Sequence, residues 1–89
     1  MNRAIVDPDQ LRHFAAQLKL FADEVRNRGT VLTAAMNELE QTWRDDQQRK
    51  FKDEFEVELR SLARIVQSAE RHVPYLVQKA SQIDAYLGR

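Results

Sequence analysis

Residues 11–43 decide the fold, and they read LRHFAAQLKLFADEVRNRGTVLTAAMNELEQTW. Leucine or valine stands at every seventh position of this stretch, and a second series with the same spacing ends at the only tryptophan of the chain. Such spacing, kept over about five heptads, is typical of a long helix that packs along a seam against another helix. The first series is Leu11, Leu18, Val25, Leu32 and Leu39, and the second is Ala15, Ala22, Gly29, Met36 and Trp43.

The second half of the chain has the same periodicity. Glycine and proline, two of each, are too few for the tight turns of a sheet. The sequence therefore predicts an all-α protein. The later heptad series are Phe55, Leu62, Ala69, Leu76 and Ile83, and, four residues behind them, Leu59, Val66, Val73, Ala80 and Leu87.

The expected helix starts carry capping signals. Asp7-Pro8-Asp9-Gln10 and Asp45-Asp46-Gln47-Gln48 both place an aspartate at the N-cap and a glutamine three residues later. We therefore expect a single domain over residues 1–89, with helix one at about 8–42, a turn at about 43–46 and helix two at about 47–87. A turn this short folds the helices into an antiparallel hairpin.

Two residues could divide these helices further. Gly29 resembles a helix C-terminus, and Pro74 removes a backbone hydrogen bond from helix two. The heptad phase nevertheless continues across both positions. We therefore expect two helices rather than three or four, with Gly29 as a close-packing point and Pro74 as a kink.

Composition excludes several classes of function. Fourteen basic residues balance fourteen acidic ones, so no basic surface for nucleic acid is expected. The absence of cysteine excludes a disulfide scaffold, a thiolate metal site and a cysteine nucleophile. No stretch approaches the roughly 18 apolar residues that a membrane span needs, so no membrane insertion is expected. The apolar run near the N-terminus is too short for a Sec-type signal peptide.

Residues that could carry chemistry are scattered. His13 and His72 are the only histidines, and neither belongs to the Glu-x-x-His pattern of bundle metalloproteins. The serines and threonines lack a nearby base, and no glycine-rich loop could hold phosphate. We expect no enzyme, no catalytic residue, no metal, no cofactor and no small-molecule substrate.

Apolar residues are more numerous than one helix–helix seam requires. Examples outside the main series are Leu20, Val31 and Ile65. A two-helix chain of this size has little stability of its own, and a second apolar face needs a second partner. We therefore expect two hairpins to form a four-helix bundle. Its seam and dimer core are expected to contain Leu11, Leu18, Val25, Leu32, Leu62, Val66, Leu76 and Ile83.

Aromatic residues gather near the expected turn. Trp43 stands at the corner, and Phe51 and Phe55 follow four residues apart on one face of helix two. Trp43 could close the end of the bundle, or it could contact another protein, as tryptophan does at interface hot spots. The residues alone favour the first interpretation.

Leu39, Trp43 and Phe51, with the chain length and the two-helix layout, resemble the WXG proteins, small helical hairpins exported by bacterial type VII secretion systems. In that family a Trp-x-Gly turn joins two antiparallel helices, dimers form four-helix bundles, and no Sec leader is used. The resemblance covers essentially the whole chain. It implies partner recognition by the turn residues Leu39, Trp43, Asp45, Phe51 and Phe55, and it favours recognition over end closure for Trp43. The implied partners are a second copy or a related WXG-like protein, and a secretion ATPase.

The sequence departs from the family pattern at two places. Asp45 stands where the family has glycine, although aspartate tolerates turn geometry and can cap the next helix. The Tyr-x-x-x-Asp/Glu export signal of many members is absent, because Lys79 stands four residues after Tyr75 and only three residues follow Tyr86.

Two functions follow from these observations. The first is a non-enzymatic substrate or co-exported adaptor of a type VII-like system, cytoplasmic before export and secreted without a Sec signal peptide. The alternative is an intracellular helical adaptor or chaperone-like coiled coil, purely cytoplasmic and unconnected with export.

Overall fold

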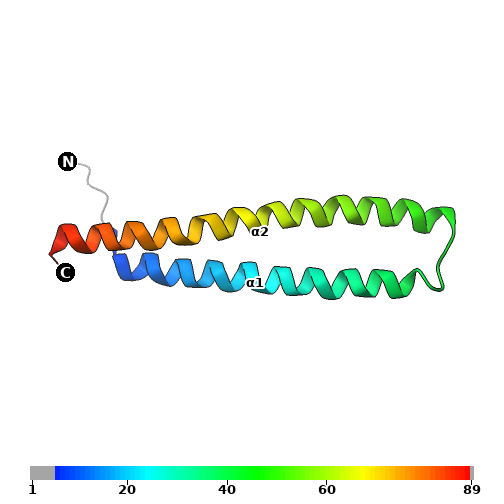
Figure 1. The fold of residues 1–89 in the computed structure, drawn as a ribbon, viewed down its shortest axis with the longest axis horizontal. Coiled ribbons are helices and arrows are strands. Elements are labelled where there is room, and N and C mark those ends of the chain that lie inside the picture. The colour runs from blue at the N-terminus through cyan, green and yellow to red at the C-terminus, as the bar shows by residue number, and fades with distance from the viewer. Residues whose placement is uncertain (1–5, 89) are drawn as a thin grey trace.

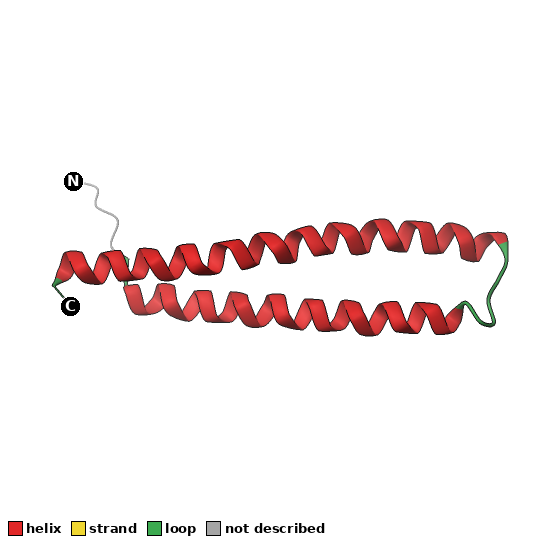
Figure 2. Cartoon of the chain, in the orientation of Figure 1, coloured by secondary structure: helices red, strands yellow, loops and turns green. Residues whose placement is uncertain are grey.

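The computed structural model describes residues 6–88, which form two antiparallel α-helices (Figures 1 and 2). Helix α1 spans Pro8–Leu39 and helix α2 spans Asp46–Leu87. The hairpin measures 64 × 24 × 14 Å, and the start of α1 lies beside the end of α2. The prediction of an all-α, antiparallel two-helix hairpin is confirmed.

Aspartate caps define where both helices begin. The Oδ1 atom of Asp7 accepts a hydrogen bond of 2.8 Å from the backbone N–H of Asp9, and Oδ1 of Asp45 accepts one of 2.8 Å from that of Gln48. Each cap satisfies a backbone donor that the first helical turn leaves unpaired. Pro8 follows Asp7 at the first helical position, where its missing N–H costs no hydrogen bond.

Helix α1 ends at Leu39, three residues before the expected boundary at 42. The backbone N–H groups of Gln41 and Thr42 donate to the carbonyls three residues earlier, Glu38 and Leu39, each at 3.1 Å. This tighter spacing ends the α-helix, although the heptad series continues to Trp43. Residues 40–45 form the connection, and α2 begins at Asp46.

Both helices run unbroken through the residues that could have divided them. Gly29 lies within α1 and Pro74 within α2, so the expectation of two helices is confirmed. The expectation that Gly29 is a close-packing point was wrong, because a Cβ atom at this position would meet nothing within 4 Å. A groove of about 590 Å³ opens between the helices here, lined by Gly29, Thr33, Leu62 and Ala63 among others.

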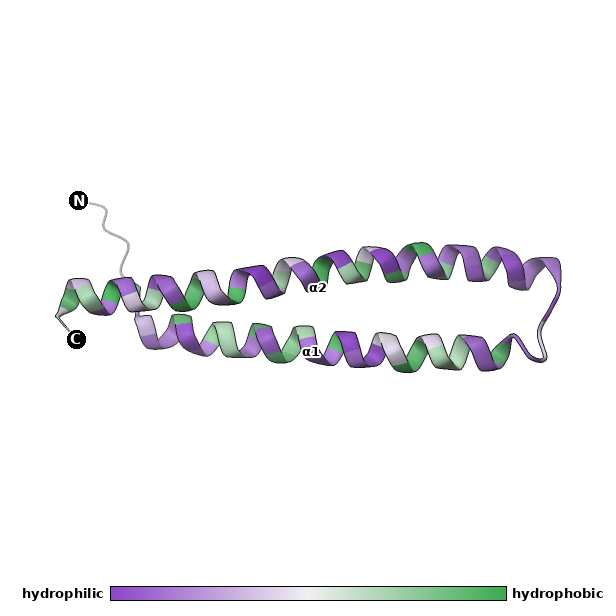
Figure 3. Ribbon diagram, in the orientation of Figure 1, coloured by the Kyte–Doolittle hydropathy of each residue, from purple (hydrophilic) through white to green (hydrophobic). Residues whose placement is uncertain are grey.

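The core of the hairpin is thin and rich in alanine. Ala22, Val66 and Ala69 form its buried cluster, and Leu18 and Val25 pack against it. Alanine brings helices close together but buries little apolar area. Apolar and hydrophilic residues alternate along both helices (Figure 3), and among the described residues no helix is both long and apolar enough to span a membrane.

Candidate interaction surface

Ion pairs connect the two helices along one side of the seam. The guanidinium of Arg26 donates two hydrogen bonds, of 2.6 and 2.7 Å, to the carboxylate of Glu70. This contact holds the pKa of Glu70 below its ordinary value. The pairs are Arg12 with Asp84, Arg26 with Glu70, and Lys52 with Glu40, and we call these six residues the charged edge.

The charged edge also sets the level at which residues of α1 and α2 face one another. Asp84 lies opposite Arg12, and Glu70 lies opposite Arg26, fourteen residues further along α1 and fourteen residues back along α2. Closer to the turn, the Nζ atom of Lys52 lies 2.7 Å from Oε1 of Glu40, and this close contact with the carboxylate raises the pKa of Lys52. The three ion pairs therefore show which residues of α1 and α2 face one another across the seam.

Large apolar side chains line the other side of the seam. Phe14 and Phe21 directly precede the buried Ala15 and Ala22, whereas Arg26 directly follows Val25, and these places flank a helix seam on opposite sides. The side chains on this side are 43–57% exposed. We call them the open edge: Phe14, Phe21, Leu32 and Leu39 of α1, and Phe51 and Ile65 of α2.

The residues expected in the seam and dimer core divide between the interior, the open edge and the groove beside Gly29, which Leu62 lines. Val66 is buried, and Leu32 and Leu62 are exposed in the single hairpin. Exposed apolar side chains that lie together on a surface mark sites of protein contact. The half-buried members of the expected set are Leu11, Leu18, Val25, Leu76 and Ile83.

An aromatic cluster forms the end of the open edge at the turn. The ring centroids of Trp43 and Phe51 are 5.9 Å apart, and those of Phe51 and Phe55 are 6.1 Å apart with nearly parallel planes. Phe51 and Leu39 are 45% and 43% exposed, while Trp43 and Phe55 are half-buried. The structure thus brings together the aromatic residues that the sequence singled out.

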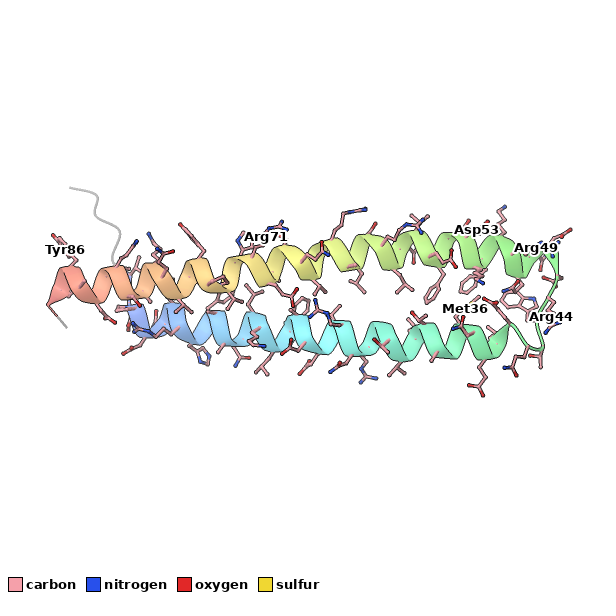
Figure 4. The ribbon with its side chains drawn as sticks, in the orientation of Figure 1. Met36, Arg44, Arg49, Asp53, Arg71 and Tyr86 are labelled. Atoms are coloured by element: carbon pink, nitrogen blue, oxygen red, sulfur yellow. The ribbon has the colours of Figure 1, made fainter. Side chains whose placement is uncertain are left out.

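Two arginines extend from the same end of the molecule. Figure 4 shows Arg44 and Arg49 at the turn. The Nε atom of Arg44 donates to the carbonyl oxygen of Glu40 at 3.0 Å, and Arg49 pairs with Asp46. Asp45, the residue at the glycine position of the Trp-x-Gly pattern, uses its side chain to cap α2. The turn is therefore braced by side-chain contacts without glycine.

Sequence reasoning missed the charged edge. The signal was present, because Arg12 and Arg26 directly follow Leu11 and Val25, and Glu70 and Asp84 directly follow Ala69 and Ile83. Opposite charges at equivalent places of two antiparallel helices face one another across the seam.

Within residues 6–88 no group of three metal-binding side chains lies close enough to hold an ion. The exposed apolar side chains of the open edge are suited to contact with another helical surface.

Comparison with known proteins points to one family. The family model WXG100, described as proteins of 100 residues with WXG, matches residues 4–86. No curated protein and no solved structure is similar enough to the chain to count as a match.

Proposed function

Because the chain belongs to the WXG100 family of small helical proteins associated with type VII secretion, we propose that it is a substrate or co-exported adaptor of such a system. Members of this family form dimers and are secreted without a signal peptide. In this proposed role the protein acts through its helical surfaces, without catalysis. The open edge is the observation that supports this role, since it offers a contact surface along the length of the hairpin.

The first step of the proposed function is pairing through the open edge. A partner hairpin laid on Phe14, Phe21 and Ile65 would cover side chains that the single chain leaves about half exposed. Full burial of one such side chain contributes about 1.5–3 kcal/mol relative to full exposure. The product is a four-helix bundle whose partner is a second copy or a related WXG-like protein.

The second step is recognition at the turn by the secretion machinery, with a membrane ATPase as the proposed receptor. Trp43 is held against Phe51, and Phe51 and Leu39 present exposed surface beside it. Aromatic side chains placed in this way are typical of interface hot spots. We therefore assign Trp43 to recognition as well as to closure of the bundle end.

Export from the native host tests the recognition step. The amount of the protein in the culture medium should fall to background when the gene for the secretion ATPase is deleted, while a Sec-dependent protein is unaffected. Trp43→Phe should keep the helical circular dichroism spectrum and lose export, because phenylalanine lacks the indole N–H and part of its contact area. A protein that stays inside wild-type cells would support the intracellular adaptor instead.

A further inference from the structure

A second cleft lies beside the turn, and polar side chains line it. It has a volume of about 440 Å³, and its walls come from the end of α1, the connection and the first turn of α2. Every residue of its lining is polar or charged. We call it the polar cleft, and its residues are Asn37, Glu40, Gln41, Arg44, Gln48 and Arg49.

The polar cleft lies on the side of the hairpin that carries the charged edge. Glu40 belongs to both. Arg49 stands 21 residues before Glu70, which is three heptads, so the two residues lie on the same flank of the seam. The aromatic cluster ends the other flank, so a partner laid on the open edge leaves the polar cleft uncovered.

Gln48 is the buried polar side chain of this cleft. It stands seven residues before Phe55, at a position of the seam series, and is only 5% exposed. Its backbone N–H donates to the capping carboxylate of Asp45, but within residues 6–88 its side-chain Nε2 atom has no hydrogen-bond partner. A buried donor without an acceptor destabilises a fold, and an apolar residue in the seam would avoid that cost. An acceptor from outside the chain would satisfy it.

Arg44 supplies a positive charge to the same cleft. Its Nε atom donates to the carbonyl oxygen of Glu40 at 3.0 Å, while its two terminal nitrogens contact no carboxylate of the described hairpin. The guanidinium of Arg49 is paired with Asp46. The carboxylate of Glu40 is paired with Lys52. Among the charged groups that line the cleft, one positive charge is therefore left without compensation.

We propose that the polar cleft binds a carboxylate group, supplied by an acidic side chain of a partner protein. Gln48 and Arg44 donate hydrogen bonds to its oxygen atoms. An ionised carboxylate carries only acceptors, and it forms its strongest hydrogen bonds with charged donors such as guanidinium. This site goes beyond the proposed function, which assigns pairing to the open edge and recognition to the aromatic cluster.

Charge and size select this ligand over two others. A phosphoryl group carries about 1.5–2 negative charges at pH 7 and would lie beside the carboxylate of Glu40, whereas one carboxylate matches the one uncompensated guanidinium. Sites for small molecules usually begin at about 300 Å³. Acetate would fill only a small part of the polar cleft, so an acid carried on a polypeptide segment fits it better.

Peptide titration of the purified full chain tests this inference. NMR spectra of the isotope-labelled protein follow the side-chain amide of Gln48 and the Nε–H of Arg44 at pH 7 and constant ionic strength. The probe is the blocked tripeptide N-acetyl-Ala-Glu-Ala-amide, which should shift both signals to saturation. The matched probe with glutamine in place of glutamate should shift neither, because it lacks the charge. Acetate and inorganic phosphate are titrated in the same way.

Variants identify the groups that bind the probe. Arg44→Gln and Gln48→Met should each raise the dissociation constant of the glutamate peptide at least about tenfold, because each removes a donor to the carboxylate. Gln48→Met should also raise the urea midpoint, since an apolar side chain of similar length replaces an unpaired buried donor. The control is Arg71→Gln, which removes an exposed arginine from the outward side of α2 in Figure 4 and should leave the constant unchanged.

The outcomes bear on separate parts of the proposal. Equal shifts with the glutamate and glutamine peptides, or no shift with either, would overturn the carboxylate site. Tighter binding of phosphate than of the glutamate peptide would overturn the choice of a carboxylate. Acetate that binds as tightly as the peptide would overturn a partner's side chain as the source. A lower urea midpoint for Gln48→Met would show that the glutamine has a structural role instead. The measurement involves neither pairing nor export, so its failure and the failure of the proposed function are distinguishable.

Discussion

The charged edge and the open edge flank the same seam and use the same heptad spacing, yet within residues 6–88 only the charged edge carries ion pairs between the two helices. On the charged edge, long polar side chains reach across the seam and pair, as Arg26 does with Glu70. On the open edge, side chains such as Phe14 and Phe21 remain more than half exposed. The contrast shows that a hairpin with an alanine-rich seam can form ion pairs on one side while the large apolar side chains on the other side stay exposed.

The two edges also differ in the free energy that they can contribute. Exposed ion pairs stabilise a fold by little, because water and salt screen them and long side chains must be held still. Apolar area removed from water contributes more, at about 25 cal/mol per Å². The open edge is therefore expected to provide most of the stability of an assembled bundle, and the charged edge to fix how the two helices of one chain align.

The largest effect is expected from a charge placed on the open edge. Phe21→Lys should raise the dimer dissociation constant at least about a hundredfold, because it removes an aromatic contact and buries an unpaired ammonium group. Light scattering at micromolar concentration should then give the mass of a single 10.4 kDa chain. The matched control is Asn27→Lys on the outer face of α1, and a dimer that survives Phe21→Lys would show that the partner binds elsewhere.

An intermediate effect should separate the seam from the open edge. Leu18→Ala should lower the free energy of unfolding by about 2 kcal/mol at any protein concentration, because Leu18 packs against the buried cluster within one hairpin. Leu32→Ala should lower the free energy of unfolding by the same amount only at concentrations where dimers form, since Leu32 is 52% exposed in the hairpin. Urea unfolding at two protein concentrations measures how each loss depends on dimer formation. Equal, concentration-independent losses at both positions would mean that Leu32 belongs to the seam.

The smallest effect is expected on the charged edge. The pKa of Glu70 is lowered by its hydrogen bonds to Arg26, so this pair stabilises the fold above the ordinary carboxyl pKa. That contribution is lost as the pH falls through the lowered pKa of the folded state. Glu70→Gln should therefore reduce stability slightly at pH 7 and make its decrease below about pH 4.5 shallower. Urea midpoints measured from pH 7 to pH 3 test this, and an unchanged pH profile would show that the pair contributes nothing.

Much of the fold could be predicted from the residue pattern. The heptads predicted two helices, and Asp7 and Asp45 predicted where they begin, because periodicity and caps are local properties of the chain. The end of α1 at Leu39 could not be predicted, since the heptad continues to Trp43 and the boundary depends on backbone hydrogen bonds of the turn. The expectation for Gly29 failed for a similar reason, because the separation of the helices at that level is a tertiary property.

The candidate surface could be predicted only in part. Trp43, Phe51 and Phe55 lie close in sequence, so their cluster follows from the position of the turn. Which flank of the seam is open could not be derived from counting apolar residues. The identity of the exposed flank depends on the register between α1 and α2, in which Arg12 contacts Asp84, 72 residues later in the sequence.

The alanine-rich core has a consequence for the lifetime of the protein. A hairpin held by Ala22, Val66 and Ala69 buries little area, so its unpaired form should open often and expose its backbone to proteases. Dimerisation stabilises a folded state by mass action, and dilution removes that stabilisation. If two hairpins pair as proposed, the concentration of the protein should therefore set its half-life. The protein should resist proteases at high concentration and should be degraded soon after dilution.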